Sequence, residues 1–257
     1  MNLPFASQYL PSLISIAATA GTKIMEIYQV DFATALKSDA SPVTAADTAA
    51  EAIIIAGLKQ HFPKIPIIAE EQQAAGQQIV IADTFFLVDP LDGTKEFISS
   101  NGEFTVNIGL IKNGAPICGV VLAPALNEIY VGELGLGAFA AKMPVLEFLK
   151  ITTRPCPSNG PTILASRSHL DAQTEAFIAA QKPASITNAG SSLKFCRVAQ
   201  GKADLYPRFG RTMEWDTAAG HAVLTASGGT VTTPDGKPFN YGKPDFANGP
   251  FIASGGR

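Results

Sequence analysis

The residues best suited to chemistry are two aspartates, Asp89 and Asp92, which follow a short apolar run. Pro90 lies between them and fixes one φ angle, while Gly93 permits a backbone conformation that other residues resist. We therefore expect a stiff turn that directs both carboxylates and the hydroxyl of Thr94 into one small volume. Hard divalent cations bind oxygen ligands held in this way. An ordinary turn at the end of a strand has a similar composition, so this motif alone leaves both interpretations open.

Three other places bring carboxylates to the expected end of a strand or start of a helix. Asp47 lies three residues after Thr44, a spacing that is also typical of a helix-capping box. Glu70 and Glu71 follow a short apolar strand and suit a solvated loop equally well. Asp216 begins a predicted helix, where its charge is favourable to the helix dipole. Taken separately, each of these carboxylates has an ordinary structural explanation.

Taken together, these carboxylates indicate a single acidic pocket at the ends of several elements. Such a pocket would repel itself unless cations filled it, and two or more Mg²⁺ ions would resolve the repulsion. Bound Mg²⁺ polarises phosphate oxygens and lowers the pKa of a bound water, which can then attack in line. The pattern therefore predicts hydrolysis of a phosphate monoester.

The elements that must position these residues fall into two parts. The first part has two helices, at about 5–29 and 44–61, beside a mostly antiparallel sheet. Asn113-Gly114 predicts a tight hairpin turn between two of its strands. The strands of this sheet are expected at 65–69, 85–89, 104–112, 115–123, 128–132 and 138–142.

A proline-rich stretch at 154–161 predicts a linker to the second part, in which strands and helices alternate as in α/β layers. We expect strands at 162–166, 185–189, 203–207 and 230–232, and helices at 171–181, 191–201 and 216–227. The strand at 230–232 is expected to be the last strand of the chain. The fold class is thus mixed α+β and α/β. Residues 1–157 would form an N-terminal α+β domain that binds metal, and residues 158–257 a C-terminal α/β domain that recognises substrate.

The composition excludes several classes of protein. The 257 residues are 46% hydrophobic and 16% charged with a net charge of −3, which excludes disorder and a broad basic face for nucleic acid. No apolar run approaches the ~18 residues of a membrane span, and no Lys or Arg precedes Lys23, so we expect neither an integral membrane segment nor a signal peptide. Three scattered cysteines fit a reducing compartment, and we expect a cytoplasmic protein. The sequence leaves the oligomeric state open.

Several motifs resemble a known family. Asp89-Pro-Leu-Asp-Gly-Thr94 and Trp215-Asp-Thr-Ala-Ala-Gly220 are similar to the paired signatures of the inositol monophosphatase superfamily, whose members are Mg²⁺-dependent, lithium-sensitive phosphatases. Further motifs resemble its 3′(2′),5′-bisphosphate nucleotidase branch: Asp39-Ala-Ser-Pro-Val-Thr-Ala-Ala-Asp47, Asp92-Gly-Thr-Lys-Glu-Phe97, Asn101-Gly-Glu-Phe-Thr-Val-Asn107, Ser166-Arg-Ser-His169, Gly190-Ser-Ser-Leu-Lys-Phe195 and Leu205-Tyr-Pro-Arg-Phe209. The resemblance implies a layered αβαβα sandwich of the sugar-phosphatase type.

The resemblance also implies roles for individual residues. The positions that match metal ligands, for two or three Mg²⁺ ions, are Glu70, Asp89, the carbonyl of Leu91, Asp92 and Asp216. Asp47 and Thr94 match the pair that orients and deprotonates the attacking water. A threonine hydroxyl that donates to a carboxylate keeps its oxygen available to accept from water, which is consistent with that role. Glu71 and Asp39 are expected just behind the ligands.

Substrate recognition is expected mostly in the second half of the chain. Lys194 and Arg208 are suitable cations for a phosphate that does not react. Gly190-Ser191-Ser192 opens a predicted helix, where unpaired N–H groups favour an anion. The resemblance matches Ser166 and His169 to positions that contact the nucleotide, and Gly93 and Thr94 complete the expected set. We expect His61 and His221 to be structural.

The leading hypothesis is removal of the 3′-phosphate from adenosine 3′,5′-bisphosphate, so the expected partner is a small phosphorylated nucleotide. By resemblance, the 3′-phosphorylated sulfate donor is a second substrate and the context is sulfur metabolism. Lys95-Glu96-Phe97 argues against the alternative, an inositol or other sugar monophosphatase, because those enzymes carry a different residue pair there. A non-catalytic nucleotide or metal sensor would lack a ligand, and every position is intact. The resemblance leaves a peripheral association with the inner membrane open.

Overall fold

The computed structural model describes residues 4, 6–29, 34–36, 42–77, 81–144, 147–166 and 171–256. Two residues assigned above to the site, Asp39 and His169, lie outside these ranges, so their expected roles stay predictions.

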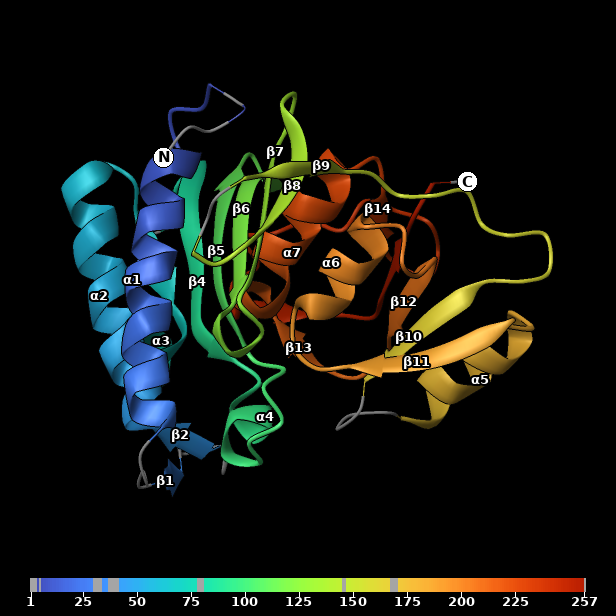
Figure 1. The fold of residues 1–257 in the computed structure, drawn as a ribbon, viewed down its shortest axis with the longest axis horizontal. Helices are drawn as coiled ribbons and strands as arrows, with labels where there is room; N and C mark the ends of the chain where they lie inside the picture. The colour runs from blue at the N-terminus through green and yellow to red at the C-terminus, as the bar shows by residue number, and fades with distance from the viewer. Residues whose placement is uncertain are drawn as a thin grey trace.

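Two long helices, α1 (Leu10–Tyr28) and α2 (Ala45–His61), lie side by side against one face of the larger sheet (Figure 1). Leu10, Leu13, Ala17 and Ile24 of α1 are fully buried at helical spacing, which confirms the expected apolar stripe. The helix begins at Leu10, later than the expected residue 5, with a proline in its first turn, where a missing N–H costs nothing.

The larger sheet has seven strands in the order β3-β4-β5-β6-β7-β8-β9, and only the β3–β4 pair is parallel. The mostly antiparallel sheet expected for the first part is therefore confirmed. The left-handed backbone at Asn113 and Gly114 makes the expected tight turn between β5 and β6. The strands are β3 (Ile67–Ala69), β4 (Thr84–Asp92), β5 (Thr105–Lys112), β6 (Ala115–Ala123), β7 (Glu128–Glu133), β8 (Gly137–Lys142) and β9 (Leu149–Ile151).

Helix α7 (Glu214–Ala226) covers the other face of this sheet and lies unusually close to it. Gly109, Gly119 and Gly132 face one another on β5, β6 and β7, so the sheet has a row without side chains. A Cβ on Gly119 would meet the carbonyl oxygen of Ala219 at 2.5 Å. Glycines on the sheet and alanines on the helix therefore allow the two backbones to touch.

The second sheet has five strands in the order β11-β10-β12-β16-β14. The expectation that strand 230–232 is the last is wrong, because two strands follow it and β16 lies between β12 and β14. The neighbouring elements are β10 (Thr162–Ser166), α5 (Ala172–Ala180), β11 (Ser185–Ala189), α6 (Leu193–Ala199), β12 (Leu205–Arg208), β14 (Thr230–Thr232) and β16 (Phe251–Ser254).

The layers follow one another as α1 and α2, the seven-stranded sheet, α6 and α7, the five-stranded sheet, and α5 (Figure 1). This order confirms the layered αβαβα sandwich. The division into 1–157 and 158–257 stays a prediction. Within the described residues, no helix combines the length and the apolar character that a membrane crossing needs. Short elements complete the chain: β1 (Thr34–Leu36), β2 (Pro42–Thr44), α3 (Glu70–Ala74), α4 (Thr94–Ile98), η1 (Pro124–Leu126), β13 (Thr212–Met213) and β15 (Ala247–Asn248).

Candidate active site

A cavity of about 320 Å³ opens where elements from both halves of the chain end. Glu70 reaches it from the start of α3, Asp92 from the end of β4, and Asp216 from the first turn of α7. These carboxylates are far apart in the sequence, so the tertiary structure brings them to one place. The residues assigned above that line the cavity are Glu70, Asp92, Gly93, Thr94, Ser166, Ser191, Lys194, Arg208 and Asp216.

The turn at the end of β4 is irregular, as its proline and glycine suggest. Pairing with β5 shifts register between Asp89 and Asp92, and Gly93 has a φ of 92°, a left-handed conformation that suits glycine. Asp89 is 2% exposed, and its Oδ1 accepts from the N–H of Leu91 at 3.0 Å. The irregular turn therefore leaves Asp89 behind the cavity and exposes Asp92 to it.

Asp47 caps α2 and also lies close to Thr94, its expected partner. One carboxylate oxygen, Oδ2, accepts from the Thr44 backbone N–H at 2.8 Å and its hydroxyl at 2.6 Å, and so caps α2. The other, Oδ1, lies 3.4 Å from the hydroxyl oxygen of Thr94. The Thr94 hydroxyl is also 3.4 Å from the carbonyl oxygen of Leu91. The cap fixes the carboxylate that faces Thr94.

Electrostatic repulsion is present among the carboxylates, as the sequence pattern predicts. Burial raises the pKa of Asp216 well above its usual range, and the nearby charges of Asp92 and Glu70 raise it further. Burial also raises the pKa of Asp92, while the charge of Lys194 opposes that increase. A divalent cation would relieve this cost, and carboxylate and carbonyl oxygens are the ligands that Mg²⁺ prefers.

The types of ligand therefore suit Mg²⁺, whereas their positions do not form a complete coordination shell. Among the described residues, no three Asp, Glu, His or Cys side chains are grouped closely enough to hold a metal ion. Backbone N–H groups explain part of this, because they hold Oδ2 of Asp92 at 2.6 Å and Oδ2 of Asp216 at 2.8 Å. The metal-ligand assignment thus stays a prediction.

The two expected phosphate-binding cations line the cavity, yet both are largely buried. Lys194 is 4% exposed, and its Nζ donates to the carbonyl oxygens of Ala189 and Ser191 at 3.2 and 2.7 Å. Burial lowers the pKa of Lys194 to about 8, against the raising effect of Asp92. Arg208 is 8% exposed and donates to the carbonyl oxygen of Gly210 at 3.3 Å. Backbone carbonyls thus hold both cations at the cavity wall.

The expectation of unpaired N–H groups at 190–192 is wrong for two of the three residues. The N–H of Gly190 donates to Glu103 Oε2 at 2.9 Å, and that of Ser192 donates to Asp92. The helix that follows, α6, starts only at Leu193. Carboxylates of the chain itself therefore occupy these donors. Ser191 does line the cavity, and its buried hydroxyl has no hydrogen-bond partner among the residues that the structure describes.

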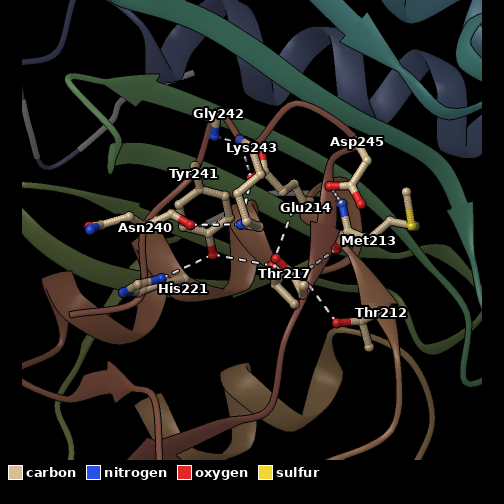
Figure 2. A network of polar contacts seen from close by, with 12 residues as sticks. Thr212, Met213, Glu214, Thr217, His221, Asn240, Tyr241, Gly242, Lys243 and Asp245 are labelled. Carbon is tan, nitrogen blue, oxygen red and sulfur yellow. Dashed lines mark hydrogen bonds and ion pairs between the residues drawn. The ribbon is translucent and has the colours of Figure 1, made fainter. Parts of the chain in front are cut away.

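A buried polar network anchors the start of α7, which carries Asp216 (Figure 2). Glu214 is fully buried, and its carboxylate accepts from the N–H groups of Gly242 and Lys243 at 2.8 and 3.0 Å. Lys243 Nζ forms an ion pair with the same carboxylate at 2.6 Å. His221 is structural, as expected, because its buried Nδ1 lies 3.0 Å from the Tyr241 hydroxyl.

Sequence reasoning missed several residues of the cavity wall. Four of them, Lys95, Glu96, Phe195 and Tyr206, belong to motifs that resemble the family. The motifs indicated the family, but they did not indicate that these side chains line the cavity. Arg211 lies outside those motifs and gave no signal. The other lining residues that were not assigned are Thr212 and Thr217.

Comparison with known proteins gives one consistent family. A model described as the inositol monophosphatase family matches residues 6–254. The 3′(2′),5′-bisphosphate nucleotidase CysQ of Shigella flexneri is 45% identical over 237 residues, which cover 90% of this chain and 93% of the relative. The crystal structure of CysQ from Bacteroides thetaiotaomicron has a TM-score of 0.83 and 38% identity, covering 96% of this chain and 97% of that chain. An IMPase of Thermotoga maritima has a TM-score of 0.80 and 28% identity, covering 97% and 93%.

Proposed function

Because the chain belongs to the inositol monophosphatase family, we propose that it is a Mg²⁺-dependent phosphatase that converts adenosine 3′,5′-bisphosphate to AMP and phosphate. The observation that carries this proposal is the cavity itself, whose wall includes the carboxylates of Glu70, Asp92 and Asp216 together with the buried cations Lys194 and Arg208. The carboxylates suit Mg²⁺ and the cations suit a second phosphate. The same reasoning extends the substrates to 3′-phosphoadenylyl sulfate and the context to sulfur metabolism.

In the proposed site, two or three Mg²⁺ ions are held by Glu70, Asp89, the Leu91 carbonyl, Asp92 and Asp216. When bound, Mg²⁺ supplies a Lewis acid for the phosphate oxygens and lowers the pKa of a bound water. Glu71 lies behind the ligands in this proposal and does not itself bind metal. This assignment is supported by the raised pKa values of Asp92 and Asp216, for which burial is the largest cause and nearby carboxylates a further one. A bound cation would favour the charged forms of both side chains.

Asp47 and Thr94 orient the attacking water in this proposal. The Thr94 hydroxyl donates its hydrogen to Asp47 Oδ1, across the 3.4 Å that separates them. The threonine oxygen can then accept a hydrogen bond from water, so that the proton released on attack moves toward Asp47. Thr44 holds the other oxygen of Asp47, which keeps the acceptor aimed at Thr94.

Substrate recognition in the proposal falls to Lys194 and Arg208 for the phosphate that does not react, with Ser166, Ser191 and Gly93 along the wall. Arg can hold a phosphate through two parallel hydrogen bonds. His169 stays a proposed nucleotide contact. Gly190 has no place in the proposal, because its N–H donates to Glu103 and it is not among the residues that line the cavity. The cytoplasm is the proposed compartment, because Cys118, Cys156 and Cys196 are all free thiols.

A phosphate-release panel tests the function. The substrates are adenosine 3′,5′-bisphosphate, inositol 1-phosphate and fructose 1,6-bisphosphate, each with Mg²⁺ and with or without Li⁺. We expect the nucleotide to have the highest kcat/KM and Li⁺ to inhibit. A preference for inositol phosphate or the sugar bisphosphate would favour the alternative, a sugar or inositol phosphatase. Binding of nucleotide without turnover would favour a sensor. Asp92→Asn serves as the inactive control.

A further inference from the structure

One buried serine, Ser192, contacts both Asp92, from the first half of the chain, and Asp216, from the second half. Its N–H donates to Asp92 Oδ2 at 2.6 Å, and its hydroxyl donates to the backbone carbonyl oxygen of Asp216 at 2.5 Å. Ser192 is 1% exposed. It is therefore wedged between the end of β4 and the first turn of α7, and it contacts the carboxylate of one aspartate and the backbone of the other.

A neighbouring asparagine fixes the direction of the Ser192 hydroxyl. Asn107 Nδ2 donates to Ser192 Oγ at 3.1 Å and lies 3.4 Å from Asp92 Oδ2. Asn107 is fully buried on β5, opposite Asp89 in the register of the sheet. The Ser192 oxygen thus accepts from Asn107 and donates to Asp216, so its single hydrogen has one direction.

The backbone around Ser192 adopts a conformation that is costly for its sequence. Ser191, just before it, has a φ of 45°, in the left-handed region that non-glycine residues avoid. A Cβ on Gly190 would meet the Glu103 carbonyl oxygen at 2.6 Å, so the preceding residue must be small. Backbone strain of this kind persists where the surroundings over-determine it, and it clusters at functional sites.

We propose that Ser192, oriented by Asn107, is a positioning residue that sets Asp92 and Asp216 relative to each other and thereby sets the affinity of the site for Mg²⁺. The inference rests on the proposed function, because it needs these two aspartates to be metal ligands. Groups that orient metal ligands typically change metal affinity about tenfold to a hundredfold when they are removed. Ser192 does not touch the substrate or the reacting atoms in this role.

The test is calorimetric titration of the substrate-free protein with Mg²⁺. Ser192→Ala keeps the N–H that binds Asp92 but loses the hydroxyl that binds Asp216, and we expect its Kd for Mg²⁺ to be about tenfold higher. With saturating Mg²⁺, kcat should recover while the half-saturating Mg²⁺ concentration stays about tenfold higher. A merely structural role would lower stability and leave the Kd unchanged.

Ser227→Ala is the matched control. Ser227 is also a buried serine, 5% exposed, and its hydroxyl donates to the carbonyl oxygen of Leu224 at 2.7 Å. It lies at the end of α7 opposite to Asp216. We expect this variant to lose comparable stability and keep its Mg²⁺ affinity. Equal affinity of Ser192→Ala and the unaltered protein would overturn the proposal.

A second variant covers the case in which Ser192→Ala does not fold. Asn107→Ala leaves the serine hydroxyl in place without its fixed direction, and we expect its Mg²⁺ Kd to rise about threefold or more. An unchanged Kd there overturns the proposal equally. If the unaltered protein neither binds Mg²⁺ nor releases phosphate, the proposed function has failed. If it does both and neither variant shifts the Kd, only the positioning role has failed.

Discussion

At the scale of single residues, several side chains do two things at once. Asp47 caps α2 with one oxygen and faces Thr94 with the other. Lys194 lies at the cavity wall, yet its charge also offsets the repulsion around Asp92. Such residues are difficult to interpret from a substitution, because their loss removes a structural partner together with a chemical group. The second-phosphate role is tested at Arg208.

Replacing Arg208 with Met should reduce kcat/KM for adenosine 3′,5′-bisphosphate about tenfold or more. The reason is that a charge-assisted hydrogen bond to phosphate contributes about 1.5–3 kcal/mol. Hydrolysis of 3′-AMP, which lacks the second phosphate, should change about threefold or less by the same argument. Steady-state phosphate release on the two substrates measures the difference.

The control for this experiment is Arg154→Met, which removes an arginine that pairs with Asp204 at 2.8 Å and does not line the cavity. We expect it to alter both substrates alike and only slightly. Equal losses on the bisphosphate and the monophosphate in Arg208→Met would rule out a role in recognising the second phosphate.

At the scale of elements, the position of α7 decides where Asp216 lies. One side of the helix rests on the glycine row Gly109, Gly119 and Gly132, and its first turn is held through Glu214 and Lys243 (Figure 2). The close approach leaves no room for the helix to slide toward the sheet. Packing on one side and hydrogen bonds at the end therefore fix the helix that carries the proposed ligand.

Replacing Gly119 with Ala tests this close approach. The added methyl group would lie 2.5 Å from the Ala219 carbonyl oxygen, so the helix must move, and we expect the free energy of unfolding to fall by about 1–3 kcal/mol. Because the helix carries Asp216, the Kd for Mg²⁺ should rise as well. Urea unfolding and Mg²⁺ titration are the measurements.

Gly249→Ala is the companion variant, since a Cβ at that residue would meet nothing within 4 Å. Its unfolding free energy should change by about 0.5 kcal/mol or less. If both alanine variants unfold at the same urea concentration, the glycine row is not what sets the distance between helix and sheet.

At the scale of the whole molecule, the site exists only when the two sheets enclose α6 and α7. Arg197 of α6 forms an ion pair with Glu128 of β7 at 2.8 Å, which ties the second half of the chain to the larger sheet. Burial raises the pKa of Glu128, but hydrogen bonds from Lys142 and Tyr130 outweigh it and lower the pKa to about 2. The contact between the second half of the chain and the larger sheet is therefore polar as well as apolar.

Acid should destabilise the assembled molecule partly through His221. Burial lowers the pKa of His221 to about 3, whereas an unfolded histidine titrates near about 6.5. Between these values the unfolded chain binds a proton that the folded protein does not. The free energy of unfolding therefore falls as pH drops through this window, by about 1.4 kcal/mol per pH unit from this residue.

His221→Gln should remove this contribution. Between pH 6.5 and 4.5 the unaltered protein should lose about 2–3 kcal/mol more stability than the variant, measured by urea unfolding at each pH. His61→Gln, which replaces an exposed histidine, is the matched control. Parallel pH profiles for the unaltered protein and His221→Gln would show that the buried ring does not titrate on unfolding.

The sequence by itself determined the chemistry and most of the elements. Hydrophobic period, proline, glycine and capping residues act within a few neighbours, so strands such as 115–123 and 162–166 and the Asn113-Gly114 turn were predictable. The carboxylates and the hydroxyl at 89–94, together with the acidic residues at other element ends, were sufficient to indicate a metal-dependent phosphatase. These features depend on residue type and local composition, which the chain carries directly.

Only the tertiary structure decided which groups meet. The insertion of β16 between β12 and β14 and the capture of the Ser192 N–H by Asp92 join residues that are distant in sequence. So does the bridge from Asn107 through Ser192 to Asp216. The physical reason is that a hydrogen bond depends on separations of about 3 Å, which are fixed only once whole layers have packed. The sequence determines which donors and acceptors are present, and the packing of the layers determines which of them form hydrogen bonds.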